Sequence, residues 1–466
     1  MSERKPNVLF ILTDQWRAQS VGYAGDPNAR TPRIDELAAE SVDFENAVSG
    51  APVCCPARAS LLTGQYPLEH GVYINDVELR PNGTTFGEAF RDAGYRTGYI
   101  GKWHLYGSPD GRYGRRTDPV PVEKQFGFEY WKAAECTHDY NESFYFEGAS
   151  TERKYWEGYD AEDQTEDACA FIADGDDERP YLLVLSYGPP HFPLHTAPER
   201  FRTLYEDAPI ELRGNVPDEL ADASTEALRG YYAHIAALDQ CVERLLEAVR
   251  RSGSAEDTIV VLTSDHGDMM GSQGIRHDVK VAPWDESVRI PLLLRYPARF
   301  GAEGTRNAVP VNTPDLMPTL LGLCGVPVPE TVRGTDVLGA SPPESAFIGM
   351  PVPILWARTY GIGAYRGLRT VRHTYIRSLQ GPWLLYDNIA DPLQLTNLCA
   401  DPAYAPLVAE LDGELDRRLA ELGDEFLPAE EYLRRDGLEH YSEVNTPVGS
   451  SEGPDGAWRS TLVPTP

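Results

Sequence analysis

The chain has 466 residues, a length that predicts one large hydrophobic core with a smaller appended domain. Hydrophobic residues make up 41% and charged residues 24%, and no stretch reaches the roughly 18 uninterrupted apolar residues that a membrane helix needs. The formal net charge of -30 repels nucleic acids and anionic membranes, so we expect neither as a partner. An anionic ligand would need a locally positive pocket.

The N-terminus is charged and polar up to Pro6, and an apolar run follows without a small-residue cleavage site, so we expect no signal peptide. The seven cysteines are scattered and show neither zinc-like pairs nor the spacing of secreted disulfides. Both features predict a cytoplasmic protein, and the excess of acidic residues raises the hypothesis of a halophile cytoplasm. The sequence gives no information on the oligomeric state.

Near-continuous apolar runs predict buried strands at 8–12, 181–187, 259–263 and 291–294, which is typical of a parallel sheet covered on both faces. Thr31 and Pro32 predict an N-cap and a first helical turn, and helical spacing of apolar residues predicts a second helix over 228–249. The fold class is therefore α/β, with a large mostly parallel sheet between helical layers.

The pattern changes after about Gly339. Segments 365–376 and 383–386 predict strands of a smaller sheet, 402–422 predicts a closing helix, and the tail from Thr446, rich in Gly, Pro and Ser, is expected to be irregular. We therefore predict an α/β domain over 1–345 and a smaller C-terminal α+β domain with antiparallel strands over 346–466.

Polar residues follow two of the predicted strands directly. Asp14 follows the run 8–12, and Asp265 and His266 follow the run 259–263. Because ligands of open α/β sheets bind beyond the carboxyl ends of the strands, these side chains can reach a common site. Carboxylate oxygens and an imidazole nitrogen form a mixed ligand set for a divalent cation. Taken alone, each residue is more typical of a polar turn.

Residues 53–64 have the sequence VCCPARASLLTG, which predicts a short helix. Pro56 is typical of a first helical turn, and Gly64 of a helix end. Cys54 would then lie at the positive end of the helix, where an anionic nucleophile is stabilised. A vicinal disulfide between Cys54 and Cys55 is not expected in a reducing compartment.

The pattern Cys54-x-Pro56-x-Arg58, followed in the same helix by Ser-Leu-Leu-Thr-Gly, resembles the signature of the formylglycine-dependent sulfatases, which belong to the alkaline phosphatase superfamily. Further blocks fall in the family's order, at 7–14, 31–46, 101–104, 190–193, 265–271, 280–291, 386–387 and 391–392. The resemblance therefore extends along the chain and implies an alkaline phosphatase-like fold.

The resemblance implies that a formylglycine-generating enzyme converts Cys54 to formylglycine. In the family, the hydrated aldehyde carries two hydroxyls, one that attacks sulfur and one that later expels sulfate, which a thiolate adduct would not allow. The resemblance also implies one divalent cation, held by Asp14, Cys54, Asp265 and His266. Ca²⁺ is expected first, with Mn²⁺ or Mg²⁺ as alternatives, because a nitrogen ligand softens the site.

Five cationic or basic residues fall where the family holds sulfate: Arg58, Lys102, His104, His191 and Lys280. By resemblance, Arg58 orients the diol, and the two lysines act as point charges on the sulfuryl group. His191 or Lys280 would protonate the leaving alcohol, and His104 would assist the proton loss of the diol. The assignment of acid and base stays open, because it depends on geometry.

Gln15 and His266 stand where many sulfatases have Asp and Asn, and in this they resemble the choline sulfatase and phosphonate monoester hydrolase branch. Gln15 is therefore expected to line the site. Asn75 is interpreted either as a polar contact to the transferred group or as a turn residue beside Asp76.

The leading hypothesis is a sulfuric ester hydrolase that cleaves a carbohydrate sulfate or another small organosulfate, which Lys102 and His104 favour. Hydrolysis of phosphonate monoesters or phosphate diesters at the same site is the alternative, favoured by Gln15 and His266. The third hypothesis is a non-catalytic binder of sulfated ligands, the outcome if Cys54 is never modified.

Overall fold

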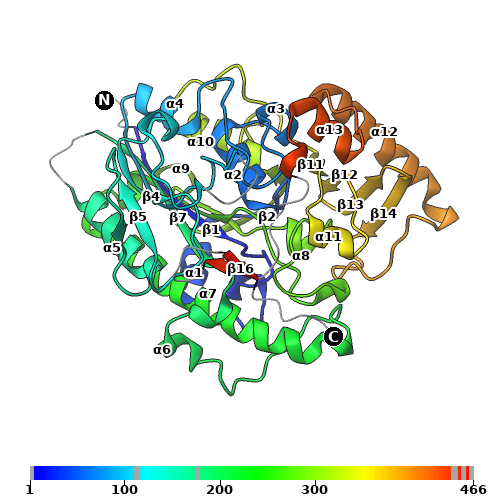
Figure 1. Cartoon of the computed structure of the whole chain (residues 1–466), viewed down its shortest axis with the longest axis horizontal. Helices are drawn as coiled ribbons and strands as arrows, with labels where there is room; N and C mark the ends of the chain where they lie inside the picture. The colour runs from blue at the N-terminus through cyan, green and yellow to red at the C-terminus, as the bar shows by residue number, and fades with distance from the viewer. Residues whose placement is uncertain (1–4, 110–114, 175–178, 442–449, 453–457, 461–466) are drawn as a thin grey trace.

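The computed structural model describes residues 5–109, 115–174, 179–441, 450–452 and 458–460 (Figure 1). A ten-stranded sheet has the order β10-β2-β9-β8-β1-β7-β3-β4-β5-β6. Its strands are β1 (Asn7–Asp14), β2 (Val42–Val48), β3 (Arg96–Lys102), β4 (Tyr130–Ala134), β5 (Phe144–Glu147), β6 (Lys154–Tyr155), β7 (Tyr181–Pro190), β8 (Thr258–Ser264), β9 (Leu292–Arg295) and β10 (Thr305–Asn312).

The centre of the sheet is parallel. Strands β8, β1, β7, β3 and β4 are neighbours that run in the same direction, so their carboxyl ends meet at one edge of the sheet. All four predicted strands are present, which confirms the mostly parallel sheet. Strand β9, however, runs antiparallel to both β8 and β2. A strand buried on both faces has the same apolar pattern in either direction, so the sequence could not indicate this reversal.

Helices cover both faces of the sheet (Figure 1). On β1, Val8 and Phe10 belong to one hydrophobic core and Leu9 and Ile11 to another, as the alternation of a strand requires. The first core contains residues of α2 (Cys54–Thr63), α4 (Phe86–Asp92) and α10 (Leu316–Leu323). The second contains residues of α1 (Pro32–Ala38), α5 (Asp160–Ala173) and α7 (Ala221–Arg251). The predicted helical layers are therefore confirmed.

The predicted helix over 228–249 lies within α7, and the predicted helix start at Pro32 is the start of α1. Thr31 holds the N-cap position but does not cap a backbone N–H; its hydroxyl donates to Asp35 Oδ1 at 3.0 Å. The shorter helices are α3 (Pro67–His70), α6 (Glu199–Arg202), α8 (Asp285–Val288), α9 (Pro297–Phe300), α11 (Leu355–Thr359) and α13 (Ala429–Asp436). Among the described residues, no helix is both long enough and apolar enough to span a membrane.

A second sheet lies at one end of the molecule (Figure 1). Its four antiparallel strands are β11 (Ser345–Met350), β12 (Tyr365–Thr370), β13 (His373–Ser378) and β14 (Gly381–Asp387). Helix α12 (Ala405–Leu422) packs Leu411, Leu415 and Leu419 against it. The predicted closing helix is α12, preceded by a 3-10 turn over Pro402–Tyr404.

The prediction of a single strand over 365–376 is wrong. The chain reverses after Thr370 and forms the β12–β13 hairpin. Thr370 Oγ1 accepts from His373 N at 2.8 Å and closes this turn. The division into domains 1–345 and 346–466 stays a prediction. Within the tail predicted to be irregular, Ser450–Glu452 pairs with Trp458–Ser460 as β15 and β16, and the rest lies outside the described residues.

Candidate active site

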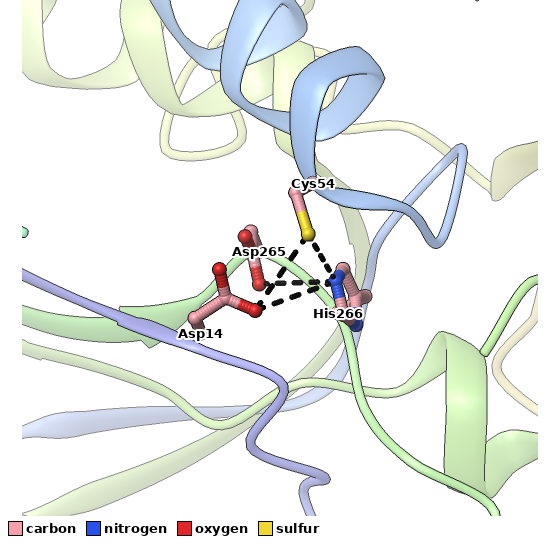
Figure 2. A group of neighbouring side chains, drawn as sticks. All are labelled: Asp14, Cys54, Asp265 and His266. Carbon is pink, nitrogen blue, oxygen red and sulfur yellow. Dashed lines mark hydrogen bonds and ion pairs between the residues drawn. The ribbon is translucent and has the colours of Figure 1, made fainter. Parts of the chain in front are cut away.

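The predicted metal ligands meet at the carboxyl edge of the parallel strands (Figure 2). Asp14 ends β1, Asp265 and His266 follow β8, and Cys54 points from the first turn of α2 toward all three. Their ligand atoms lie within 4.8 Å of one another, and all four side chains are buried. Residues more than 200 positions apart in sequence thus form the one cluster that the sequence analysis predicted.

Helix α2 forms as its residues predict. Gly64 takes the left-handed conformation at φ 64° and donates its N–H to Ser60 O at 2.9 Å, which ends the helix. At the other end, Asn75 Oδ1 accepts the backbone N–H of Cys55 at 3.0 Å. Asn75 therefore satisfies a first-turn donor of the helix that carries Cys54.

Arg58 binds the carboxylates of both Asp14 and Asp265. Its Nε donates to Asp265 Oδ2 at 3.0 Å and its Nη2 to Asp14 Oδ2 at 3.2 Å, while Nη1 donates to Ser186 Oγ at 2.7 Å. Lys102 Nζ lies 2.5 Å from Asp14 Oδ2. Burial and the Cys54 sulfur would raise the pKa of Asp14, but these cations hold that pKa below its ordinary value.

The second carboxylate and the imidazole are shifted in a different way. Burial and the neighbouring Asp14 raise the pKa of Asp265. His266 is buried, yet Asp265 raises its pKa. Arg58 pairs with both carboxylates and Lys102 pairs with Asp14 alone, so Asp265 is the less compensated of the two buried acids.

The sulfur of Cys54 is surrounded by positive groups. Sγ lies 3.3 Å from His266 Nε2 and 3.2 Å from Lys280 Nζ. Burial would raise the pKa of the thiol, but Lys102, Lys280 and His266 hold it well below its ordinary value. The site therefore favours an anionic group at the position of this sulfur.

Lys280 and His191 form a pair beside Cys54. His191 follows β7 and donates its Nδ1–H to Phe192 O at 2.8 Å, so its Nε2 can accept from Lys280 Nζ at 3.0 Å. Burial and Lys280 lower the pKa of His191 to about 3. At neutral pH the His191 imidazole is therefore neutral.

Gln15 lines the site through the same lysine. Its Oε1 accepts from Lys280 Nζ at 3.0 Å, and its Nε2 donates to Asp268, a buried carboxylate. The amide is thus oriented by one partner on each side. Asp268 was missed by the sequence analysis, although it lies in the predicted block 265–271.

The structure adds His138 and Asp76, which were not among the predicted site residues. Strand β4 ends beside β3, and the segment after it carries Cys136 and His138. The His138 ring stacks on His191 with centroids 4.4 Å apart and planes inclined by 13°. Asp76 Oδ1 lies 3.5 Å from His104 Nε2. The polar residues after β4 could have indicated further site residues, but the sequence analysis did not predict this short strand.

The family described as Sulfatase matches residues 6–326. The chain belongs to the sulfatase family. This family lies in the alkaline phosphatase superfamily, and its members are hydrolases of sulfate esters. A second family, described as N-sulphoglucosamine sulphohydrolase, C-terminal, matches residues 277–421. The resemblance and the enzyme class drawn from the sequence are therefore confirmed.

Several sulfatases are similar to this chain along most of its length. An ulvan-active sulfatase of Formosa agariphila is 43% identical, over 92% of this chain and 84% of its own. A choline-sulfatase of Rhizobium meliloti is 29% identical over 90% and 87%. Among solved structures, the YidJ protein of Bacteroides fragilis has a TM-score of 0.81 and 30% identity, over 93% and 98% of the two chains.

The same fold occurs in an enzyme of the alternative class. The phosphonate monoester hydrolase of Agrobacterium radiobacter has a TM-score of 0.68 and 23% identity, over 98% of this chain and 100% of its own. At this identity the likeness concerns the fold alone.

Proposed function

We propose that this sulfatase hydrolyses a carbohydrate sulfate ester, or another small organosulfate, with a formylglycine made from Cys54 and one bound divalent cation. The observation that carries the proposal is the convergence of Asp14, Asp265 and His266 on Cys54 inside a ring of cationic side chains. Maturation would require a formylglycine-generating enzyme as a partner.

The donor atoms fit a divalent cation. Each carboxylate uses one oxygen, Oδ2, to bind Arg58, and directs the other, Oδ1, to the cluster, within 3.6 Å of His266 Nε2. His266 donates its Nδ1–H to Gly267 O at 2.9 Å, which leaves Nε2 as the ligand nitrogen. Oxygen ligands favour Ca²⁺, and the imidazole keeps Mn²⁺ and Mg²⁺ as alternatives.

When bound, the cation would lower the pKa of a formylglycine hydroxyl and neutralise sulfate oxygens. The protein's own residues do the rest. Lys280, within contact distance of Cys54, would bind the sulfuryl oxygens or give its proton to the leaving oxygen, and neutral His191 would accept from it. Lys102 holds Asp14 in place. His104 would take the proton whose loss releases sulfate.

The relatives support a carbohydrate as the alcohol part of the substrate. One acts on ulvan, and another is named as an N-acetylglucosamine-6-O-sulfatase. The match to the choline-sulfatase supports a smaller organosulfate instead. We rank a sulfated sugar first because the relative with 43% identity is the ulvan-active enzyme.

Hydrolysis of phosphonate monoesters or phosphate diesters is the second candidate. Gln15 and His266 favour it, because these residues resemble that branch of the superfamily. Lys102 and His104 favour sulfate, because the resemblance gives the phosphonate hydrolase branch no lysine at the position of Lys102. Binding of sulfated ligands without catalysis is the third candidate, and it depends on an unmodified Cys54.

Two measurements test the proposal. Mass spectrometry of the Cys54 peptide, from protein made with a formylglycine-generating enzyme, should show the aldehyde in place of the thiol. Rates with 4-nitrophenyl sulfate and a 4-nitrophenyl phosphonate should then be compared on the same protein. We expect a higher kcat/KM for the sulfate. A strong preference for the phosphonate would reverse the ranking of the first two candidates. An unmodified Cys54 thiol in protein from the native host would favour the third candidate, a non-catalytic binder of sulfated ligands.

A further inference from the structure

The backbone of His104 is fixed by the strand next to it. His104 follows β3, and its N–H donates to Glu135 O at 2.7 Å. The Glu135 carboxylate accepts the backbone N–H groups of the next three residues, Leu105, Tyr106 and Gly107, at 2.8 to 3.1 Å. These bonds hold the turn, and His104 adopts a left-handed backbone at φ 60°. They do not orient the imidazole ring.

In the part of the chain that the structure describes, one carboxylate lies at ion-pair distance from the ring of His104. Among the described residues, neither ring nitrogen has a hydrogen-bond partner of good geometry, and the side chain is 2% exposed. Asp76 Oδ1 lies 3.5 Å from Nε2. A buried imidazole needs a partner, so the carboxylate of Asp76 is the group that can select its tautomer and orientation.

Asp76 is itself rigidly held. Arg116 binds its carboxylate with two hydrogen bonds of 2.8 and 2.7 Å, which keep the pKa of this buried acid below its ordinary value. The backbone N–H of Asp76 donates to Cys55 Sγ at 3.3 Å, and its carbonyl accepts from Ser108 N at 2.7 Å.

The turn at 75–76 also touches the helix that carries the nucleophile. Asn75 accepts the N–H of Cys55, and Asp76 donates to the sulfur of the same residue. Asp76 has a left-handed backbone at φ 65°, as His104 does. Non-glycine residues in this conformation gather at functional sites because the surrounding structure must hold them there.

We infer that Asp76, fixed by Arg116, is a positioning residue that holds His104 in the orientation needed for sulfate release. The inference rests on the proposed function, in which His104 takes the proton whose loss frees sulfate. With Nε2–H directed to Asp76, Nδ1 is the nitrogen that can accept this proton. The carboxylate then stabilises the imidazolium, as a carboxylate does behind a catalytic histidine.

The test is Asp76→Asn in enzyme whose Cys54 modification has been confirmed by mass spectrometry. Asparagine keeps the shape and one contact to Arg116 but removes the charge behind His104. In stopped flow with 4-nitrophenyl sulfate, nitrophenol should appear at the wild-type rate in the first turnover. The steady-state rate should then fall by about 10- to 100-fold, the usual loss for such a supporting carboxylate.

Three variants make the result specific. Glu78→Gln removes a nearby carboxylate that pairs with Lys124 and Arg80, and it should leave both phases unchanged. Arg116→Lys keeps the positive charge but loses the bidentate contact to Asp76, so it should show a smaller burst. This variant replaces Asp76→Asn in the test if Asp76→Asn does not fold. His104→Ala is the benchmark and should show the full burst.

These outcomes distinguish the inference about Asp76 from the proposed function. A burst in His104→Ala without one in Asp76→Asn overturns the role of Asp76 and leaves the proposed function intact. Equal slowing of both phases in His104→Ala refutes the role that the proposed function gives His104, and the inference falls with it. A wild-type steady-state rate in Asp76→Asn also overturns the inference.

Discussion

Replacing Arg58 by Met removes a buried cation that neutralises two buried carboxylates. Arg58 is 2% exposed and binds both Asp14 and Asp265. In the variant, Asp14 keeps its ion pair with Lys102, whereas Asp265 loses its ion pair with Arg58. Removing one member of a buried ion pair costs about 3 to 5 kcal/mol. With about 1 kcal/mol/K of unfolding entropy for 466 residues, Tm should fall by about 3 to 5 °C.

Thermal unfolding followed by intrinsic fluorescence, in EDTA and in Ca²⁺, measures this loss. The shift should be larger in EDTA, because a bound divalent cation supplies part of the missing positive charge. Arg33→Met is the matched control, since Arg33 is 43% exposed and pairs with exposed Glu36 and Glu243; its Tm should change by less than about 1 °C. An Arg58→Met protein that melts within about 1 °C of wild type in EDTA would refute the reasoning.

Three further predictions concern the metal, pH and the helix cap. Chelation with EDTA should lower the Tm of wild type but not of Asp265→Asn, and equal losses would argue against a metal at this cluster. Burial lowers the pKa of His70 to about 3, so below about pH 6.5 only the unfolded state gains this proton. This group should therefore destabilise the fold by about 1.4 kcal/mol per pH unit between pH 6 and 4, and urea unfolding of His70→Asn should lack that part of the slope. Asn75→Ala leaves the buried N–H of Cys55 unpaired and should cost about 1 to 3 kcal/mol in the same assay.

Much of the site followed from local sequence patterns. A buried apolar run that ends in a polar residue indicates a strand end, and this pattern correctly placed Asp14 and Asp265. Proline in a first turn and glycine at the end likewise defined the helix of Cys54. Such features depend on neighbouring residues alone, so they can be read without knowing the rest of the fold.

Other parts of the site depend on which distant segments become neighbours. Lys280 Nζ meets Gln15 across 265 positions, and Arg116 meets Asp76 across 40. The antiparallel course of β9 and the stacking of His138 on His191 arise in the same way. The periodicity of a sequence reports that a residue is buried, and it does not report its partner. Its own segment therefore placed Cys54 at a helix start, whereas the sheet brings the cationic side chains around its sulfur.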